Sequence, residues 1–537
     1  MSDSVINRIV NQPPQAGHQL TLATLGGISS LPLTEVYEQS GRLAAALAAA
    51  GVGRGDRIGI LAANRLEWVL LDLAALRLGA VTAGFEPAKF DPSPDLLSAY
   101  SLKVLFTDRA TVAPSDGPDP RGPLAVAIAT ARGPRGPLAP SIRPISEVTR
   151  LTGSAAPVEL PGIEYGPLDV TTIKFTSGST GQPKGLAATV GSIDSSINAV
   201  QQMFHHTGGD NVFCFLPLSL LQQRYWLYSA LAFGHDLTIS TYEAAFAMMR
   251  RVEPTVVMGV PGFFESAKKL IESRTADTAA AARQLFGTKI RYLWTGSAPA
   301  RPSMLRFFTD LGMPIYEGYG LNETCIVAKN HPGAHREGSV GQVLPGKKVL
   351  LDADGVVAIH SDYPVNWRYE YAAPGESERV FQPDGTVRTG DLGYIDDEGF
   401  LFIRGRADDV IVLDNGKKII VRPLEEYLKA SPAIDDAVIF CPAQTHLVAV
   451  VSPAADPPDT GAIAERLTRC NASFTGDEQI AHLVIAPERF SIGNGLLTSQ
   501  FKPRRQQILR AYADQINGRV STRPGAGSDG GNGNNGF

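Results

Sequence analysis

Short apolar runs and longer helical patterns alternate along most of the chain, and this alternation restricts the folds open to it. Apolar runs that predict buried strands lie at 57–63, 104–108, 172–178, 212–217, 236–240, 255–261 and 290–296. Segments with apolar residues at helical spacing separate most of these runs. Such alternation is typical of largely parallel sheets with helices on both faces, where ligands bind beyond the carboxyl ends of the strands.

Composition excludes several classes of protein. Lys plus Arg number 49 and Asp plus Glu number 54, so the formal net charge is −5, which argues against a general nucleic-acid binder. Hydrophobic residues make up 44% of the chain, enough for a large core. The four cysteines have no paired spacing, which argues against a zinc site or a disulfide framework. No signal peptide or transmembrane segment is predicted, and we expect a cytoplasmic protein.

The pattern changes near residue 385, which predicts more than one domain. A hairpin is expected where two short runs flank the letters DDEG, and residues 409–515 have the pattern of a small α+β unit. Residues 109–168, rich in Pro and Gly, predict a long connection. The Gly-rich tail, 516–537, predicts disorder.

The segment that indicates chemistry is TTIKFTSGSTGQPKGLAAT, residues 171–189. A strand runs into a loop of glycines and hydroxyl residues closed by Lys184, and such a loop can surround a polyphosphate with N–H donors and one positive charge. It is not a Walker A loop, because Gly178 to Lys184 reads GSTGQPK. An ordinary Ser/Gly turn is the alternative, and ten consecutive matching residues after a strand argue against it.

TSGSTGQPKG closely resembles the phosphate loop of the adenylate-forming enzymes, which include acyl- and aryl-CoA synthetases, peptide-synthetase adenylation domains and luciferases. Four further segments resemble that family in the expected order: EGYGLNE (317–323), RTGDLG (388–393), GRADDVIVLDNGKKI (405–419) and NGLLTSQFKPRR (494–505). The last is similar to the long-chain acyl-CoA synthetase branch. The resemblance implies an α/β fold with a large N-terminal domain, 1–408, and a mobile C-terminal α+β cap, 409–515.

The resemblance also implies an ATP-dependent, AMP-forming ligase. A small carboxylic acid attacks the α-phosphate of ATP, giving an acyl-adenylate and pyrophosphate, and coenzyme A then displaces AMP. Transfer to an amine or a carrier-protein thiol is the alternative, and a nucleotide-binding protein that only senses or scaffolds is a third reading. We expect no nucleic-acid partner, and either a monomer or a homodimer.

Site residues follow from the same resemblance. The phosphate loop is expected to hold the β- and γ-phosphates through Thr176, Ser177, Gly178, Ser179, Thr180, Gly181 and Lys184. The adenine side is expected at Gly296, Ser297, Ala298, Tyr319, Gly320 and Asn322, with Tyr319 stacking on the base. Asp391 and Arg406 match the residues of that family that contact the ribose. Glu323, with Thr176, matches the group that positions Mg²⁺, since this ion needs few protein carboxylates.

Two residues of the C-terminal part complete the expected machinery. Lys502 matches the catalytic lysine that bridges the carboxylate and the α-phosphate, a role that suits a mobile point charge. Asp408 matches the hinge about which the small domain rotates after adenylation.

The chain departs from the family pattern in three places. Leu220 stands where the acyl-CoA synthetase branch usually has histidine, which motivates the alternative acceptor. Asn322 replaces threonine in the YGxTE segment and can still donate to a phosphate oxygen. Residues 359–381 replace a glycine–aromatic segment with an irregular, aromatic-rich sequence, which predicts a specialised enzyme.

Overall fold

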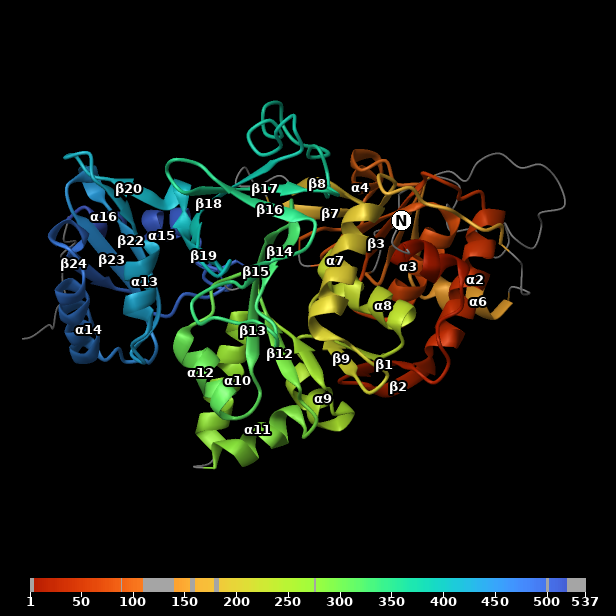
Figure 1. Ribbon diagram of the computed structural model, residues 1–537, viewed down its shortest axis with the longest axis horizontal. Helices are drawn as coiled ribbons and strands as arrows, with labels where there is room; N and C mark the ends of the chain where they lie inside the picture. The colour runs from red at the N-terminus through yellow and green to blue at the C-terminus, as the bar shows by residue number, and fades with distance from the viewer. Residues whose placement is uncertain are drawn as a thin grey trace, which may run out of the picture. The chain divides into compact units, whose positions relative to one another are not determined.

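The computed structural model describes residues 4–87, 89–109, 140–154, 160–177, 183–274, 277–498 and 502–518. The chain divides into two compact units, residues 1–403 and 404–537 (Figure 1). The boundary predicted at Asp408 stays a prediction. Most of the predicted connection at 109–168 and of the predicted disordered tail lies outside the described residues.

One sheet of the first unit has the strand order β6-β5-β3-β4-β7-β8 in the described chain. Its strands are β3 (Arg57–Leu61), β4 (Val81–Phe85), β5 (Val104–Thr107), β6 (Ser141–Pro144), β7 (Val170–Ser177) and β8 (Pro183–Thr189). All run parallel except β8, which pairs antiparallel with β7. The loop between β7 and β8 therefore begins at the carboxyl end of a buried strand, as the sequence predicts.

A second sheet has the order β15-β14-β13-β12-β11-β9-β10-β1-β2 among the described residues. Its strands are β1 (Gln19–Thr24), β2 (Gly27–Pro32), β9 (Asn211–Cys214), β10 (Asp236–Ser240), β11 (Val256–Met258), β12 (Tyr292–Thr295), β13 (Ile315–Leu321), β14 (Cys325–Lys329) and β15 (Gln342–Val343). The run from β13 to β1 is parallel, and antiparallel strands close both edges.

Helices connect the parallel strands and cover the sheets (Figure 1). Those described in the first unit are α1 (Val5–Asn11), α2 (Leu33–Ala49), α3 (Leu66–Leu78), α4 (Pro94–Ala99), α6 (Glu147–Ser154), α7 (Val190–Phe204), α8 (Leu221–Phe233), α9 (Ala245–Val252), α10 (Pro261–Arg274), α11 (Thr278–Phe286) and α12 (Pro302–Asp310). The largest apolar cluster includes Ile58 of β3, Val212 of β9 and Trp226 of α8, so the two sheets share a core.

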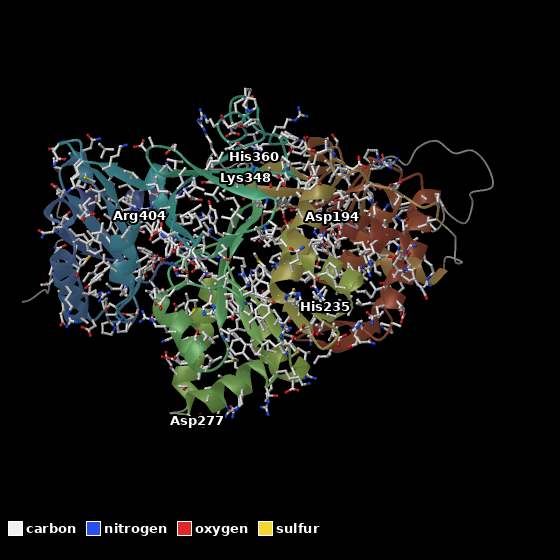
Figure 2. All side chains as sticks on the ribbon, viewed as in Figure 1. Asp194, His235, Asp277, Lys348, His360 and Arg404 are labelled. Carbon is white, nitrogen blue, oxygen red and sulfur yellow. The ribbon has the colours of Figure 1, made fainter. Side chains whose placement is uncertain are left out.

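The amino-terminal helix is joined to the body by a carboxylate on α7. Asp194, labelled in Figure 2, accepts hydrogen bonds from the Ser4 hydroxyl at 2.6 Å and from the Ile6 N–H at 3.0 Å. Both donors lie at the start of α1, where backbone N–H groups lack partners within the helix. This carboxylate therefore caps a helix distant from it in sequence.

A smaller antiparallel sheet, with the order β16-β17-β18-β19, ends the first unit. Its strands are β16 (Lys347–Leu351), β17 (Val356–Ser361), β18 (Val387–Ile395) and β19 (Leu401–Arg406). The predicted hairpin is β18 and β19, joined by a turn in which the Asp396 N–H donates to the Phe400 carbonyl at 3.0 Å. Residues 362–386 form an irregular loop between β17 and β18.

The second unit is α+β. Its described elements are β20 (Val410–Val412), β21 (Lys418–Ile420), β22 (Ile434–Phe440), β23 (Leu447–Pro453), β24 (Ile480–Ile485), α13 (Arg422–Lys429), α14 (Thr460–Ser473), α15 (Arg505–Ala511) and α16 (Ala513–Ile516). Strand β22 pairs antiparallel with β23, and β24 pairs parallel with it. The predicted fold class, a large α/β domain with mainly parallel sheets and a smaller α+β domain, is confirmed. No described helix is long and apolar enough to cross a membrane.

Candidate active site

The lysine that closes the phosphate loop lies at the start of β8. Lys184 is opposite Thr176 in the β7–β8 register, so the strand pair holds the two ends of the loop together. Its side chain is 14% exposed and its ammonium lies 3.0 Å from the Glu376 carboxylate. The backbone of Thr176 and Ser177 belongs to β7, and the predicted loop residues Gly178, Ser179, Thr180 and Gly181 lie outside the described residues.

The β13–β14 hairpin positions the predicted aromatic and carboxylate side chains. Its register shifts between Tyr319 and Gly320, and a Cβ at Gly320 would lie 2.0 Å from the Cys325 carbonyl oxygen. Only glycine therefore fits at this bulge. The turn is closed by the Leu321 N–H, which donates to the Thr324 hydroxyl at 3.0 Å. Asn322 is exposed and Glu323 half-buried at the tip of this turn.

Tyr319 and Asp391, predicted from separate motifs, meet in the structure. The Tyr319 hydroxyl donates to Asp391 Oδ2 at 2.5 Å. Asp391 is 7% exposed, and its own N–H donates to the Thr389 hydroxyl at 3.0 Å within β18. The Tyr319 hydroxyl takes one of the roughly four acceptor positions of an ionised carboxylate.

The predicted adenine-side loop follows β12 and lies against β13. A Cβ at Gly296 would lie 3.2 Å from the Gly318 carbonyl oxygen, so the loop approaches the strand closely. Ser297 has a φ of +70°, a left-handed conformation that is uncommon for residues other than glycine. The Ala300 N–H donates to Glu317 Oε1 at 3.0 Å and holds the far end of the loop.

Tyr369 and Glu376, two residues of the irregular loop, contact the predicted site, although the sequence did not predict a role for them. The Tyr369 hydroxyl donates to Glu323 Oε1 at 2.7 Å, and the Lys184 ammonium lies 5.0 Å from the Tyr369 ring centroid. The hydrogen bond from Lys184 lowers the pKa of the Glu376 carboxyl. The lysine and the carboxylate expected to meet the polyphosphate are thus linked through one short segment. Its unusual composition is visible in the sequence, but its position was not predictable.

Two polar side chains, one fully buried and one half-buried, donate hydrogen bonds at strand ends of the second sheet. The Lys329 ammonium, fully buried on β14, donates to the carbonyls of Thr295 at 3.1 Å and Tyr316 at 2.6 Å, and burial lowers its pKa far below the ordinary value. Asn64 donates to the carbonyls of Leu216 and Ser240, both at 2.9 Å. Sequence reasoning missed both residues, because a lysine in a strand and an asparagine in a turn are ordinary there.

The remaining predicted residues belong to the second unit. Arg406 is ion-paired with Asp408 at 3.1 Å, and Asp408 lies in the 3₁₀ turn Ala407–Asp409. The Lys502 carbonyl accepts from the Thr498 N–H at 2.8 Å, and the Lys502 N–H donates to the Thr498 hydroxyl at 3.1 Å. The Lys502 side chain is exposed.

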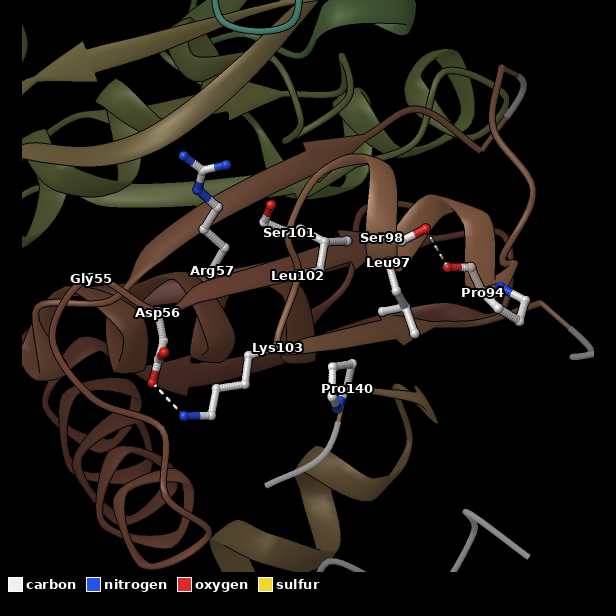
Figure 3. Close-up of a pocket in the computed structure, with 10 residues that line it drawn as sticks. All are labelled: Gly55, Asp56, Arg57, Pro94, Leu97, Ser98, Ser101, Leu102, Lys103 and Pro140. Carbon is white, nitrogen blue, oxygen red and sulfur yellow. Dashed lines mark hydrogen bonds and ion pairs between the residues drawn. The ribbon is translucent and has the colours of Figure 1, made fainter. Parts of the chain in front are cut away.

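A cavity of about 670 Å³ lies elsewhere in the first unit, at the amino-terminal ends of β3 and β5 (Figure 3). Lys103 and Asp56 form a 2.8 Å ion pair on its wall, with Arg57 nearby. Because ligands of parallel sheets bind at the carboxyl ends of the strands, this cavity is at the wrong edge for the chemistry predicted here.

The first unit carries several of the residues predicted for a nucleotide site: a lysine, a carboxylate on a turn, and a tyrosine–aspartate pair. Together with a second α+β unit, these features fit the predicted class, an ATP-dependent, AMP-forming ligase. Sequence profiles agree, since that of the AMP-binding enzymes matches residues 16–359 and that of the AMP-binding enzyme C-terminal domain matches 408–522. The chain therefore belongs to the AMP-binding enzyme family.

Named relatives extend the comparison. The long-chain-fatty-acid–CoA ligase FadD15 of Mycobacterium tuberculosis is 28% identical over 567 residues, covering 90% of this chain and 91% of that protein. The peroxisomal long chain acyl-CoA synthetase 7 of Arabidopsis thaliana is 23% identical, covering 92% and 82%. ATP-bound MatB from Rhodopseudomonas palustris shares the fold, with a TM-score of 0.76 and 22% identity over 96% of this chain and 100% of that one. The predicted family and enzyme class are confirmed.

Proposed function

We propose that this enzyme activates a carboxylic acid with ATP and passes the acyl group to coenzyme A. A carboxylate oxygen attacks the α-phosphorus, the bond to the bridging oxygen breaks, and pyrophosphate leaves. The thiolate of coenzyme A then attacks the acyl carbon of the adenylate, and AMP leaves. The observation that carries the proposal is the grouping of Lys184, Glu323 and the Tyr319–Asp391 pair in a chain of the AMP-binding family.

The first step is difficult because a weak nucleophile approaches a polyanion. Lys184 and the backbone donors of the loop from Thr176 to Gly181 are proposed to neutralise the β- and γ-phosphates. The loop sequence is made mostly of glycine and short hydroxyl residues, a composition that suits close approach of a phosphate to backbone N–H groups. Positive charge is therefore supplied where charge collects on the departing pyrophosphate.

The base and sugar of the nucleotide are proposed to bind beside β13. The Tyr319 ring and the loop Gly296–Ser297–Ala298 take the adenine, and Asp391 accepts from the ribose hydroxyls. Support comes from the hydrogen bond between Tyr319 and Asp391, which holds both side chains in place. Asn322, exposed on the neighbouring turn, can donate to a phosphate oxygen.

The residues present fit a magnesium ion carried by the nucleotide. Mg²⁺ binds through one or two carboxylates plus phosphate oxygens and water, so Glu323 alone is an adequate protein ligand. Among the described residues no group of three or more His, Cys, Asp and Glu side chains is arranged to hold a metal ion by itself. When bound, Mg²⁺ supplies neutralising charge to the phosphates; Glu323 and Thr176 are the residues proposed to hold it.

The second unit is proposed to supply a catalytic lysine and a hinge. Lys502 brings a positive charge to the carboxylate and the α-phosphate during adenylation, and Arg406 contacts the ribose. Asp408 is the proposed hinge, with the domain boundary there. The 3₁₀ turn Ala407–Asp409 is a short element whose backbone torsions can change without unfolding a helix or strand.

A fatty acid is the proposed substrate, and coenzyme A the proposed acceptor. The names of FadD15 and its Arabidopsis counterpart support both. An apolar group is formed by Phe215, which follows β9, Tyr242, which follows β10, and Phe263 in the first turn of α10; the Phe215 and Phe263 centroids are 4.3 Å apart. Transfer to an amine or a carrier protein is not favoured by these relatives, even though Leu220 replaces a histidine. A cytoplasmic location and a monomer or homodimer stay predictions.

The test is product analysis with purified enzyme, ATP, Mg²⁺, coenzyme A and a panel of fatty, aryl and amino acids. We expect AMP, pyrophosphate and an acyl-CoA from at least one fatty acid, with no product when the acid is omitted. Lys184→Met should reduce the rate more than about a hundredfold. The matched control Lys103→Met removes an ion-paired lysine at the opposite edge and should retain activity. Formation of ADP, or of an amide without acyl-CoA, contradicts the proposal.

A further inference from the structure

Residues 369–376 of the irregular loop lie along β8, the strand that carries Lys184. Glu370 and Gly185 exchange two backbone hydrogen bonds, of 2.8 and 2.9 Å, so the segment extends the sheet by one bridge. Next along the segment, Tyr371 packs edge-on against Tyr100, with centroids 5.0 Å apart, and its hydroxyl accepts a hydrogen bond from Arg57. These bonds, like the contacts with the predicted site, must open before the segment can leave β8.

Two side chains of the segment contact Lys184 and Glu323, the groups expected to meet ATP. The Glu376 carboxylate is 3.0 Å from the Lys184 ammonium, and both side chains are mostly buried, at 13% and 14% exposure. The Tyr369 hydroxyl donates to Glu323 at 2.7 Å. The Tyr369 ring also covers Lys184, at 5.0 Å from ring centroid to nitrogen. The Glu376 carboxylate and the face of the Tyr369 ring therefore both contact the Lys184 ammonium.

A carboxylate in this position competes with a phosphate. Both are anions that accept hydrogen bonds from ammonium, so Glu376 takes a donor of Lys184 that a phosphate oxygen would use. An ionised Glu376 would also lie within a few ångströms of the arriving polyphosphate, and like charges at that distance repel. Glu376 remains ionised at neutral pH, because the hydrogen bond from Lys184 lowers the pKa of its carboxyl.

We propose that residues 369–376 form an autoinhibitory latch, in which Glu376 and Tyr369 hold Lys184 and Glu323 until ATP with its magnesium ion displaces them. The inference rests on the proposed function, since it takes Lys184 and Glu323 as the groups that meet the nucleotide. While the site holds no nucleotide, the latch pairs Lys184 with the Glu376 carboxylate and holds Glu323 by the hydrogen bond from Tyr369. When ATP binds, a phosphate replaces the Glu376 carboxylate beside Lys184, and the segment is released.

Glu376→Gln removes the competing charge and keeps the side-chain shape. We expect its Kd for ATP, measured calorimetrically with Mg²⁺ and without acid or coenzyme A, to fall about fivefold to tenfold below that of the unaltered enzyme. The matched control is Glu378→Gln, an exposed carboxylate two residues along the same loop, which should leave the Kd unchanged. If the Kd of Glu376→Gln for ATP equals or exceeds that of the unaltered enzyme, the latch proposal is refuted.

Hydrogen exchange tests displacement directly in the unaltered enzyme. ATP should speed exchange of the amides of residues 366–378, because the bonds between Glu370 and Gly185 open when the segment leaves. Slower or unchanged exchange there contradicts the latch and indicates that Tyr369 and Glu376 only position the site. If the unaltered enzyme binds no ATP at all, the proposed function itself fails. If it binds ATP but Glu376→Gln binds no more tightly, only the latch fails.

Discussion

The buried ion pair between Asp72 and Arg224 offers a stability prediction whose size follows from the structure. Their side chains are 1% and 0% exposed, and Arg224 Nη1 lies 2.8 Å from Asp72 Oδ1. Arg224 also donates to the Thr172 hydroxyl of β7 at 2.9 Å, and the Tyr228 hydroxyl donates to Asp72 Oδ2 at 2.5 Å. The pair thus joins α3 and α8 to the strand that leads into the phosphate loop.

Asp72→Asn leaves the Arg224 charge buried without its counter-ion. At 2.8 Å and an effective dielectric constant of about 20, the lost attraction is about 6 kcal/mol. Relaxation and entry of water reduce the net loss, and breaking buried pairs generally costs about 3–5 kcal/mol. We therefore expect the free energy of unfolding of the first unit to fall by that amount. Losses of this size are a large share of ordinary domain stability, about 5–15 kcal/mol.

The assay is urea unfolding followed by tryptophan fluorescence, with two comparison variants. Asp72→Asn combined with Arg224→Met removes both charges, while the amide oxygen of the introduced asparagine still accepts from Tyr228, so most of the lost stability should return. Asp91→Asn breaks an exposed pair with Arg109, whose side chains are 89% and 39% exposed, and should change stability by less than about 0.5 kcal/mol. If the double variant is no more stable than Asp72→Asn alone, the reasoning from an unpaired buried charge is refuted.

Three further predictions concern separate residues. Lys502→Ala should slow adenylate formation by orders of magnitude while leaving transfer from preformed acyl-adenylate to coenzyme A largely intact; equal losses in stopped-flow measurements of both half-reactions would contradict its role. Burial lowers the pKa of His206 to about 3, so its contribution to stability is complete above about pH 6.5 and is lost as pH falls toward 3. Between about pH 7.5 and 5.0 the unaltered protein should lose about 2 kcal/mol more unfolding free energy than His206→Gln, and parallel pH profiles would refute this. Gly320→Ala places a Cβ 2.0 Å from the Cys325 carbonyl oxygen. Calorimetry should therefore show that the affinity for ATP falls more than about tenfold. An unchanged affinity would contradict the conclusion that only glycine fits at this bulge.

Strand positions were predictable from apolar runs, but their ends were not. Each of the seven apolar runs overlaps a strand, because a strand buried on both faces needs continuous apolar residues. The run 255–261 exceeds its strand, Val256–Met258, since Pro261 opens α10 and apolar side chains continue into that helix. Apolar composition alone does not separate a strand from the buried turn that follows it.

Contacts among the proposed site residues were predictable where a motif is local in sequence. Glu323 and Tyr319 lie in one hairpin, and the conformation of Gly320 is set by its near neighbours. Tyr369 and Glu376 were not predictable, because they reach Lys184 and Glu323 through an irregular loop without periodic pattern. Only the tertiary structure shows which charges face one another. The hydrogen bond between Tyr319 and Asp391 likewise joins segments 72 residues apart.

The most direct test of the proposed chemistry follows oxygen atoms. The enzyme is given ATP, Mg²⁺, coenzyme A and a fatty acid whose two carboxylate oxygens are both ¹⁸O, and the products are analysed by mass spectrometry. Attack of the carboxylate on the α-phosphorus, followed by transfer to the thiol, leaves one ¹⁸O in AMP and one in the acyl-CoA. AMP carrying one ¹⁸O with unlabelled pyrophosphate is the predicted result. Unlabelled AMP, or label in pyrophosphate or phosphate, contradicts an acyl-adenylate intermediate.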